Sequence, residues 1–159
     1  MNEKLDRPTP RELTDRGICP TCYDRAHGRI VFGDDADILL FRDADIECFF
    51  AKNPRAPGHM CIASTPHYQD MSEAPDALNE KIVRYASFCM KKLTEIFGCA
   101  RVYLCTMCDG PANHYHVQLI PRYPDEERGS DNFVKPRGEY VFDKARFEAM
   151  RAALAAFSG

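Results

Sequence analysis

Two histidines and a glutamine alternate along one short stretch of the chain, as His114, His116 and Gln118 in HYHVQLIP. Residues two apart on a strand point to the same face of a sheet, so these side chains predict one polar row. The residues of the opposite row are apolar: Tyr115, Val117 and Leu119. A solvated face of an antiparallel sheet can also produce this alternation. Because imidazole is both a nucleophile and a metal ligand near neutral pH, the row also fits a catalytic or metal site.

A pair of cysteines in CPTC, Cys19 and Cys22, is the second feature that can do chemistry. Two thiolates spaced C-x-x-C can hold half of a tetrahedral zinc site, although the spacing also suits a redox pair or two structural cysteines. Zinc would need two more ligands, from the histidines or from Cys105 and Cys108 in CTMC. The second cysteine pair is the weaker choice, because LCTM is typical of a strand, where residues three apart face opposite sides.

The whole chain limits the classes of protein to consider. It has 159 residues, 45% of them hydrophobic, and a net charge of −3, which suits one domain with a sizeable core and no double-stranded nucleic-acid partner. No run of 18 apolar residues predicts a membrane span, and the polar start of the sequence lacks the apolar region of a secretory signal. We therefore expect a cytoplasmic protein with reduced cysteines. Four of them lie in apolar stretches and are expected in the core: Cys48, Cys61, Cys89 and Cys99.

The hydrophobic pattern predicts a single α+β domain over residues 17–159, after an arm over residues 1–16. Thr9 and Pro10 mark a helix start within the arm, and residues 19–22 predict a turn-rich knuckle. Two helices are expected in the domain, over 72–97 and 142–157, and residues 122–140 are expected to form a loop. A mostly antiparallel sheet of about five strands completes the fold. The strands are expected at 37–41, 46–51, 59–64, 100–107 and 114–121.

The pattern H-x-H-x-Q, followed by apolar residues, resembles the motif of the histidine-triad (HIT) superfamily. The glutamine form is similar to the branch that contains galactose-1-phosphate uridylyltransferase and the dinucleoside-polyphosphate phosphorylases. Three further segments resemble the family: NPRAPGHMCIASTPH, DGP before the triad and LIPR after it. The resemblance extends from about Cys19 to Arg122 and implies a HIT-like fold and a homodimer.

The resemblance to zinc-containing members of the superfamily also implies a ligand set. Carried over residue by residue, the ligands of one zinc ion are Cys19, Cys22, His67 and His114. Four protein ligands leave no open position for water, so this zinc is expected to be structural.

The superfamily's reaction implies that His116 attacks the α-phosphorus of a nucleotide or sugar nucleotide and forms a covalent nucleotidyl-imidazole. Water or a phosphate acceptor then takes the nucleotide, which makes the protein a hydrolase or a nucleotidyl transferase. The Gln118 amide can donate a hydrogen bond but cannot protonate a leaving group, so weakly basic leaving groups such as sugar phosphates or pyrophosphate are expected. Substrate contacts are expected from Phe49, Asn113 and His59.

Two departures from the family pattern keep other functions open. Ala51 stands where an acidic or amide residue usually holds the ribose, and DGPANH is shorter than the usual phosphate loop. Arg122 and Arg137 can contact phosphate or remain solvated. The alternative is a zinc-stabilised module that binds a nucleotide or a protein without turnover. A redox protein that uses the cysteine pairs is a third hypothesis.

Overall fold

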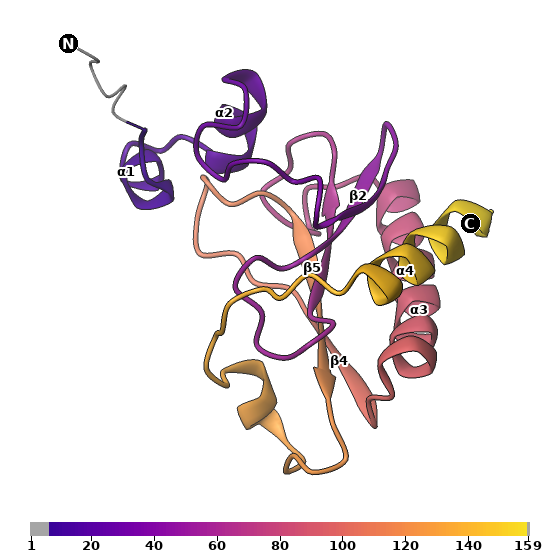
Figure 1. The fold of residues 1–159 in the computed structure, drawn as a ribbon. Coiled ribbons are helices and arrows are strands. Elements are labelled where there is room, and N and C mark those ends of the chain that lie inside the picture. The colour runs from indigo at the N-terminus through magenta and orange to yellow at the C-terminus, as the bar shows by residue number, and fades with distance from the viewer. Residues whose placement is uncertain (1–6, 159) are drawn as a thin grey trace.

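An antiparallel sheet of five strands lies at the centre of the computed structural model, which describes residues 7–158 (Figure 1). The strand order is β1-β2-β3-β5-β4. The strands are β1 (Leu39–Arg42), β2 (Ile46–Phe50), β3 (Met60–Ser64), β4 (Arg101–Cys105) and β5 (His116–Arg122). The predicted α+β class and antiparallel sheet are confirmed. The part of the predicted arm at residues 1–6 lies outside the described residues.

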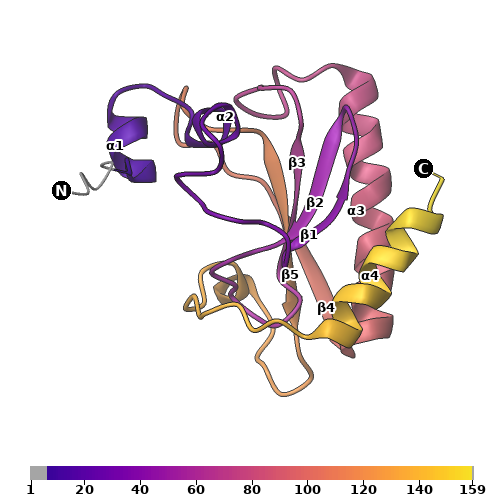
Figure 2. The same ribbon diagram turned by 45° about the horizontal axis from the view of Figure 1, so that its top comes forward.

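The two long predicted helices, α3 (Asp76–Phe97) and α4 (Lys144–Ala156), cover one face of the sheet (Figure 2). Helix α3 begins at Asp76 rather than Ser72, because Pro75 occupies its N-cap position and the Ser72 backbone N–H donates to the Asp70 side chain at 2.8 Å. Its apolar side joins the core together with the inner faces of β2, β3 and β5. The helix ends at Gly98, whose φ of 70° is a left-handed conformation that glycine adopts without strain.

Two short helices precede the sheet, so residues 7–158 contain four α-helices: the two predicted in the domain, one at the predicted start in the arm, and one that was not predicted. Helix α1 (Pro10–Asp15) has the expected cap, in which the Thr9 side chain accepts from the Glu12 backbone N–H. Helix α2 (Pro20–Ala26) forms where the sequence predicted a turn-rich knuckle. Cys19 is its N-cap residue and accepts the Cys22 N–H at 3.4 Å, so the C-x-x-C spacing forms the first turn of a helix.

The segment 122–140 contains one 3₁₀ turn, η1 (Ser130–Phe133), within the predicted loop. After this turn an extended segment, residues 134–143, runs beside the loop between β2 and β3, and we refer to it as the strap. The Gly138 N–H donates to the Pro54 carbonyl at 2.7 Å, and the Tyr140 N–H donates to the Lys52 carbonyl at 3.2 Å. These bonds bring the strap next to the carboxyl-terminal end of β2.

The strand register assigns the polar row to the face of the sheet that α3 and α4 leave free. Tyr115, Val117 and Leu119 belong to the hydrophobic core on the helical side, as the alternation predicts. Gln118 pairs with Cys61 of β3 and with Cys105 of β4. His116 and Gln118 therefore lie on the face opposite the long helices.

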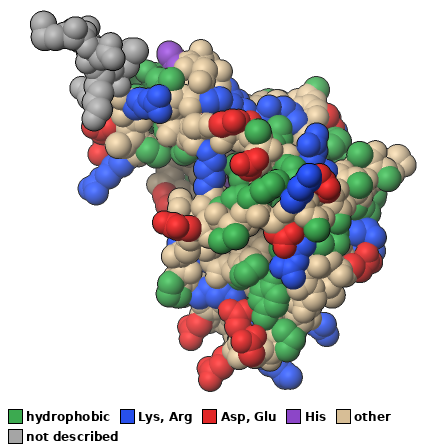
Figure 3. All heavy atoms as spheres, viewed as in Figure 1, with side chains coloured by type: hydrophobic (Ala, Val, Ile, Leu, Met, Phe, Trp, Pro, Cys, Tyr) green, Lys and Arg blue, Asp and Glu red, His purple; other side chains and the backbone are tan. Residues whose placement is uncertain are grey.

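The surface has no single dominant charge on the face drawn in Figure 3, where acidic and basic side chains are interspersed. None of the helices among residues 7–158 combines the length and the apolar character that crossing a membrane requires.

Candidate functional site

Four potential metal ligands from separate parts of the chain meet near the start of β5. They are the residues that the family resemblance implies: Cys19, Cys22, His67 and His114. One ligand atom from each lies within 4.8 Å of all the others. The second cysteine pair is not part of this group, because Cys105 ends β4 and Cys108 is exposed in the following loop.

The separations within the group match the edges of a tetrahedron. His114 Nδ1 lies 3.4 Å from His67 Nδ1 and 3.5 Å from the sulfur atoms of Cys19 and Cys22. The Cys22 sulfur lies 3.4 Å from His67 Nδ1. Atoms bound tetrahedrally to zinc at about 2.1–2.3 Å are separated by about 3.4–3.8 Å. The residues present therefore fit one zinc ion.

The protonation of His114 suits a ligand. Its Nε2 lies 2.7 Å from the Ser64 carbonyl, which can only accept, so the ring proton lies on Nε2 and Nδ1 has a free lone pair. Burial lowers the pKa of His114 to about 4, which favours the neutral imidazole. Burial, followed by the neighbouring Cys19, raises the pKa of the Cys22 thiol to about 11, and a cation at the centre would offset this by stabilising the thiolates.

Ion pairs attach helix α2 to the sheet beside this group. Arg25, three residues after Cys22, donates to the Thr65 carbonyl at 2.6 Å and pairs with Glu47 of β2 at 2.9 Å. Glu47 is buried and also pairs with Arg42 at 2.8 Å, so its charge is compensated. The cysteines of α2 are therefore held against the sheet by contacts that do not involve the metal ligands.

The hydrogen bond of His116 leaves one ring nitrogen free for chemistry. His116 Nδ1 lies 2.8 Å from the carbonyl oxygen of His114, which can only accept. The proton is thus on Nδ1, and Nε2 keeps its lone pair. This is the protonation that a nucleophilic imidazole requires, and the ring is partly exposed to solvent.

His59 determines which end of the Gln118 amide faces a ligand. The Arg55 backbone N–H donates to His59 Nδ1 at 2.9 Å, so the His59 proton lies on Nε2. His59 Nε2 then donates to Gln118 Oε1 at 3.1 Å. The NH₂ of Gln118 has no hydrogen-bond partner among residues 7–158. Burial is the main cause that lowers the pKa of His59 to about 4, which keeps this arrangement neutral at pH 7.

His116 and Gln118 line a cavity of about 350 Å³, which is large enough for a small organic molecule. Phe49, an expected substrate contact, lines the same cavity. The apolar wall of the cavity is formed by Phe32, Ile38, Leu39, Phe49 and Ala51. The cationic residues that line the cavity are Arg25, Arg29, Lys52 and Arg137. A nucleotide contains both an apolar base and anionic phosphates, and the wall offers partners for both.

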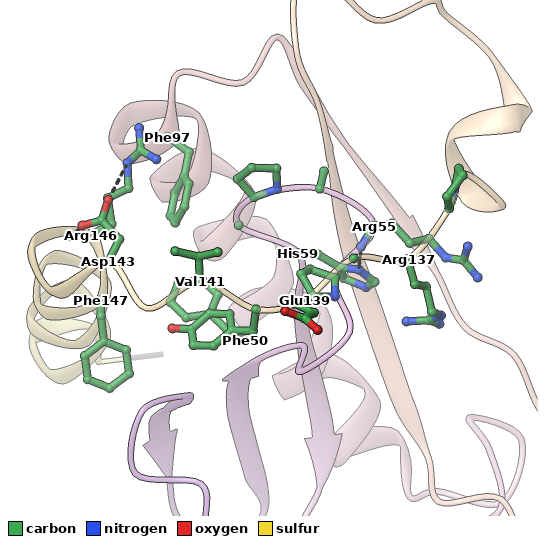
Figure 4. A pocket seen from close by; sticks show the side chains of 17 residues that line it. Phe50, Arg55, His59, Phe97, Arg137, Glu139, Val141, Asp143, Arg146 and Phe147 are labelled. Atoms are coloured by element: carbon green, nitrogen blue, oxygen red, sulfur yellow. Dashed lines mark hydrogen bonds and ion pairs between the residues drawn. The ribbon is translucent and has the colours of Figure 1, made fainter.

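A second cavity of about 590 Å³ lies against His59 (Figure 4). Arg55 and Arg137 lie beside His59 in this view, whereas Phe97 and Phe147 lie on the other side of the cavity. Arg137 lines both cavities, so it marks the point where the two are neighbours.

Asn113, an expected substrate contact, lies elsewhere, and so does Arg122, for which phosphate contact and solvation were both open. The Asn113 side chain donates to the Gln69 carbonyl and does not line the cavity of His116. Arg122 is buried and donates to the carbonyls of Tyr123 and Glu126, so it is not available to a ligand in that cavity. No residue of the short loop 108–113 lines the cavity. The short loop therefore supplies no phosphate donor to the cavity wall.

Sequence reasoning missed residues that act through tertiary contacts. Asp24 is fully buried and accepts the backbone N–H groups of Val31 and Phe32 at 2.7 and 3.1 Å, which positions Phe32 on the apolar wall. Arg55, which lies beside His59, belongs to the segment NPRAPGH that resembles the family, but the resemblance assigned no role to Arg55 itself. Neither residue occurs in a spacing that carries a chemical meaning by itself.

No protein-family model and no curated protein sequence matches this chain. Solved structures do match in fold. A zinc-bound histidine-triad family protein from Mycobacterium smegmatis has a TM-score of 0.57 at 16% identity, over 74% of this chain and 83% of that one. A HIT family protein from Bacillus anthracis has a TM-score of 0.56 at 17% identity, over 87% and 97% of the two chains.

A diadenosine triphosphate hydrolase from Plasmodium falciparum, solved in complex with cyclomarin A, is also similar in fold. Its TM-score is 0.56 at 12% identity, over 79% of each chain. The chain therefore has the histidine-triad fold, as the resemblance of its motifs implied.

Proposed function

We propose that this chain is a nucleotide phosphate hydrolase or nucleotidyl transferase that acts through a covalent nucleotidyl-His116 intermediate. The observation that carries the proposal is the hydrogen bond from His116 Nδ1 to the His114 carbonyl, which leaves Nε2 as a free nucleophile at the wall of a cavity. The histidine-triad fold, shared with a diadenosine triphosphate hydrolase, supports the same chemistry.

The reaction has two displacements at phosphorus. His116 Nε2 donates its lone pair to the α-phosphorus, and the bond from phosphorus to the leaving oxygen breaks with its electron pair. Nδ1–H continues to donate to the His114 carbonyl and disperses the charge of the imidazolium. Water, which gives up a proton to solvent, or a phosphate oxygen then attacks the same phosphorus, and the bond from phosphorus to Nε2 breaks with its electron pair returning to the nitrogen.

Gln118 has a separate role in this proposal. Because His59 occupies its Oε1, its NH₂ donates to a non-bridging phosphate oxygen and strengthens that bond as charge develops. The amide cannot protonate the leaving group, which favours leaving groups that are stable as anions. Phe49 lines the apolar wall for the base, and His59 acts through Gln118 rather than on the substrate.

We also propose that Cys19, Cys22, His67 and His114 bind one structural zinc ion. The tetrahedral separations within the group support this assignment. When bound, the ion would link α2 to the start of β5 and would fix the carbonyl of His114 that accepts the His116 proton. Since the four ligands fill its coordination shell, the chemistry belongs to His116.

Replacement of His116 by alanine tests the mechanism. Turnover of dinucleoside polyphosphates and nucleotide sugars should disappear in His116→Ala, while zinc content and thermal unfolding remain near those of the wild type. Rapid acid-free quenching with a labelled nucleotide should trap an acid-labile adduct on the wild-type protein and none on the variant. If His116→Ala retains wild-type activity on the best substrate, the covalent mechanism is wrong.

A second candidate function is a binding module without turnover. It is favoured by the absence of loop 108–113 from the cavity wall and by the apolar Ala51 in that wall. Such a protein would bind nucleotides in the cavity but would form no adduct on His116. Equilibrium dialysis with the same labelled nucleotides distinguishes the two, since both functions predict binding and only the enzyme predicts the adduct.

A further inference from the structure

Among the cations of the cavity that contains His116, several are already engaged by partners. Arg25 pairs with Glu47 at 2.9 Å, and Arg29 pairs with Asp35 at 3.0 Å. Lys52 donates to two backbone carbonyls of the loop that follows α2. These three side chains support the walls of the cavity and have little capacity left for a substrate anion.

Arg137, the fourth cationic residue of this cavity, still has donors that could bind a substrate anion. Its one hydrogen bond within residues 7–158 runs from Nη1 to the Asn53 carbonyl at 2.8 Å, and no described carboxylate pairs with it. Arg55 is similar, since Nη1 donates to the Lys135 carbonyl and no described carboxylate pairs with it. The buried Nε of Arg55 has no hydrogen-bond partner among the described residues. Two guanidinium groups with free donors thus occur in one part of the molecule.

The two arginines lie close enough to affect each other. Both line the cavity against His59 (Figure 4), and the strap that carries Arg137 is bonded to the loop that carries Arg55. Burial lowers the pKa of Arg55, and the charge of Arg137 lowers it further. Two unpaired like charges held together are unfavourable, and an anion bound between them would remove the repulsion.

The position of the pair relative to Gln118 follows from the cavity and from two hydrogen bonds. Arg137 lines the cavity of His116 and Gln118, and the Arg55 backbone N–H donates to His59, which donates to Gln118. Cys61 and Cys105 flank Gln118 in the sheet. Burial raises the pKa of both thiols, and the positive charge of Arg137 opposes both increases. Arg55 also opposes the increase at Cys105. These effects agree with a position of the pair near Gln118, which lies two residues beyond His116 on β5.

We propose that Arg55 and Arg137 bind the phosphate of the leaving group, so that the site selects substrates in which a phosphoanhydride is broken. This inference rests on the proposed function and specifies its substrate class. As Nε2 of His116 bonds to the α-phosphorus, the leaving oxygen takes the electron pair and its phosphate gains negative charge. Gln118 cannot supply a proton, so guanidinium groups must balance this charge.

The arginine pair also compensates for the absence of loop 108–113 from the cavity wall. The missing contacts of that loop are replaced by cations from the opposite side, namely from the β2–β3 loop and from the strap. Arginine suits this role because its planar group offers two parallel donors to a phosphate and keeps its charge at any pH of interest.

Substrates that share a nucleotide but differ in leaving group test the proposal. Diadenosine triphosphate has a phosphate leaving group, whereas adenosine 5′-phosphoramidate releases an amine from the same α-phosphorus. Arg55→Gln and Arg137→Gln should each lower kcat/KM for the triphosphate by about 10–100-fold and change that for the phosphoramidate by less than about threefold. Arg137→Lys, which keeps the charge, should recover part of the loss.

The matched control is Arg84→Gln, an exposed arginine on α3, which should leave both rates unchanged. Equal losses on the two substrates would overturn the proposal, because the arginines would then act on the α-phosphate or on the fold. Unchanged rates for the triphosphate would overturn it as well.

Binding of inorganic pyrophosphate, measured by calorimetry, separates this proposal from the proposed function. The wild type should bind pyrophosphate, and the double variant Arg55→Gln/Arg137→Gln should bind it at least about tenfold more weakly. If no nucleotide is turned over but pyrophosphate binding depends on the pair, the proposed function fails and the anion site stands. If the double variant binds pyrophosphate as the wild type does, the pair is not an anion site, whatever the turnover.

Discussion

His59 should make the stability of this protein depend on pH, because it is buried in a neutral form. Its side chain is 1% exposed, accepts from the Arg55 N–H and donates to Gln118. Protonation would place a second proton on Nδ1, which faces a backbone N–H that can only donate. The folded protein therefore resists protonation of His59 more than the unfolded chain does.

The size of the effect follows from the pKa, which burial lowers from an ordinary value of 6.5 to about 4. As the pH falls below 6.5, the unfolded chain takes up the proton first, so the folded state loses stability until the pH reaches about 4. Between pH 7 and pH 5 this linkage amounts to about 2 kcal/mol. The stabilisation is fully present above pH 6.5 and is lost as the pH falls toward 4.

Two replacements of His59 isolate this contribution. In His59→Asn the side-chain oxygen can still accept from Arg55, and in His59→Gln the amide can still donate to Gln118. Neither variant titrates in this range. Urea unfolding of zinc-loaded wild type and of both variants at pH 7 and pH 5 should show a loss for the wild type that exceeds the loss for the variants by about 2 kcal/mol.

All three proteins have the same metal ligands, so the titration of these ligands changes their unfolding free energies equally. The difference between wild type and variants therefore reports on His59 alone. If the variants lose as much stability between pH 7 and pH 5 as the wild type does, His59 is not held neutral and the reasoning is wrong. Activity at pH 7 separates the two hydrogen bonds, because only His59→Asn should leave Gln118 unoriented and lower kcat.

Three further predictions concern the metal, the leaving group and the assembly. Cys22→Ser should reduce zinc below one ion per chain and lower the thermal midpoint of unfolding strongly, because metal binding is coupled to folding. Measurements of zinc content and calorimetry test this, and a variant that is fully metallated and equally stable would contradict it. Gln118→His should raise the rate for an amine or alkoxide leaving group relative to a phosphate leaving group, since the new residue can protonate it; an unchanged ratio of kcat/KM would argue against the role of Gln118. We also expect a homodimer, supported by the open edge of β4 and by the 44% exposed Leu104 on that strand, and a monomer by light scattering would count against it.

The sequence by itself determined the elements of the fold. The alternation around His116 predicted the strand and both of its faces, because a strand has a period of two. Apolar residues three or four apart predicted α3, and Gly98 predicted its end. These features depend on residues that are close in the sequence, so local stereochemistry fixes them. The C-x-x-C pair also depends on local geometry, but its first turn of helix was mistaken for a knuckle of turns.

Only the tertiary structure decided which side chains meet. His59 and Gln118 are far apart in the sequence, and their hydrogen bond exists because β3 and β5 are neighbours in the sheet. Arg55 and Arg137 come together because backbone hydrogen bonds hold the strap against the β2–β3 loop. Asn113 was expected at the substrate but donates to the Gln69 carbonyl instead. Such contacts depend on the path of each loop through space, and that path is set by packing against distant residues rather than by the spacing of neighbours along the chain.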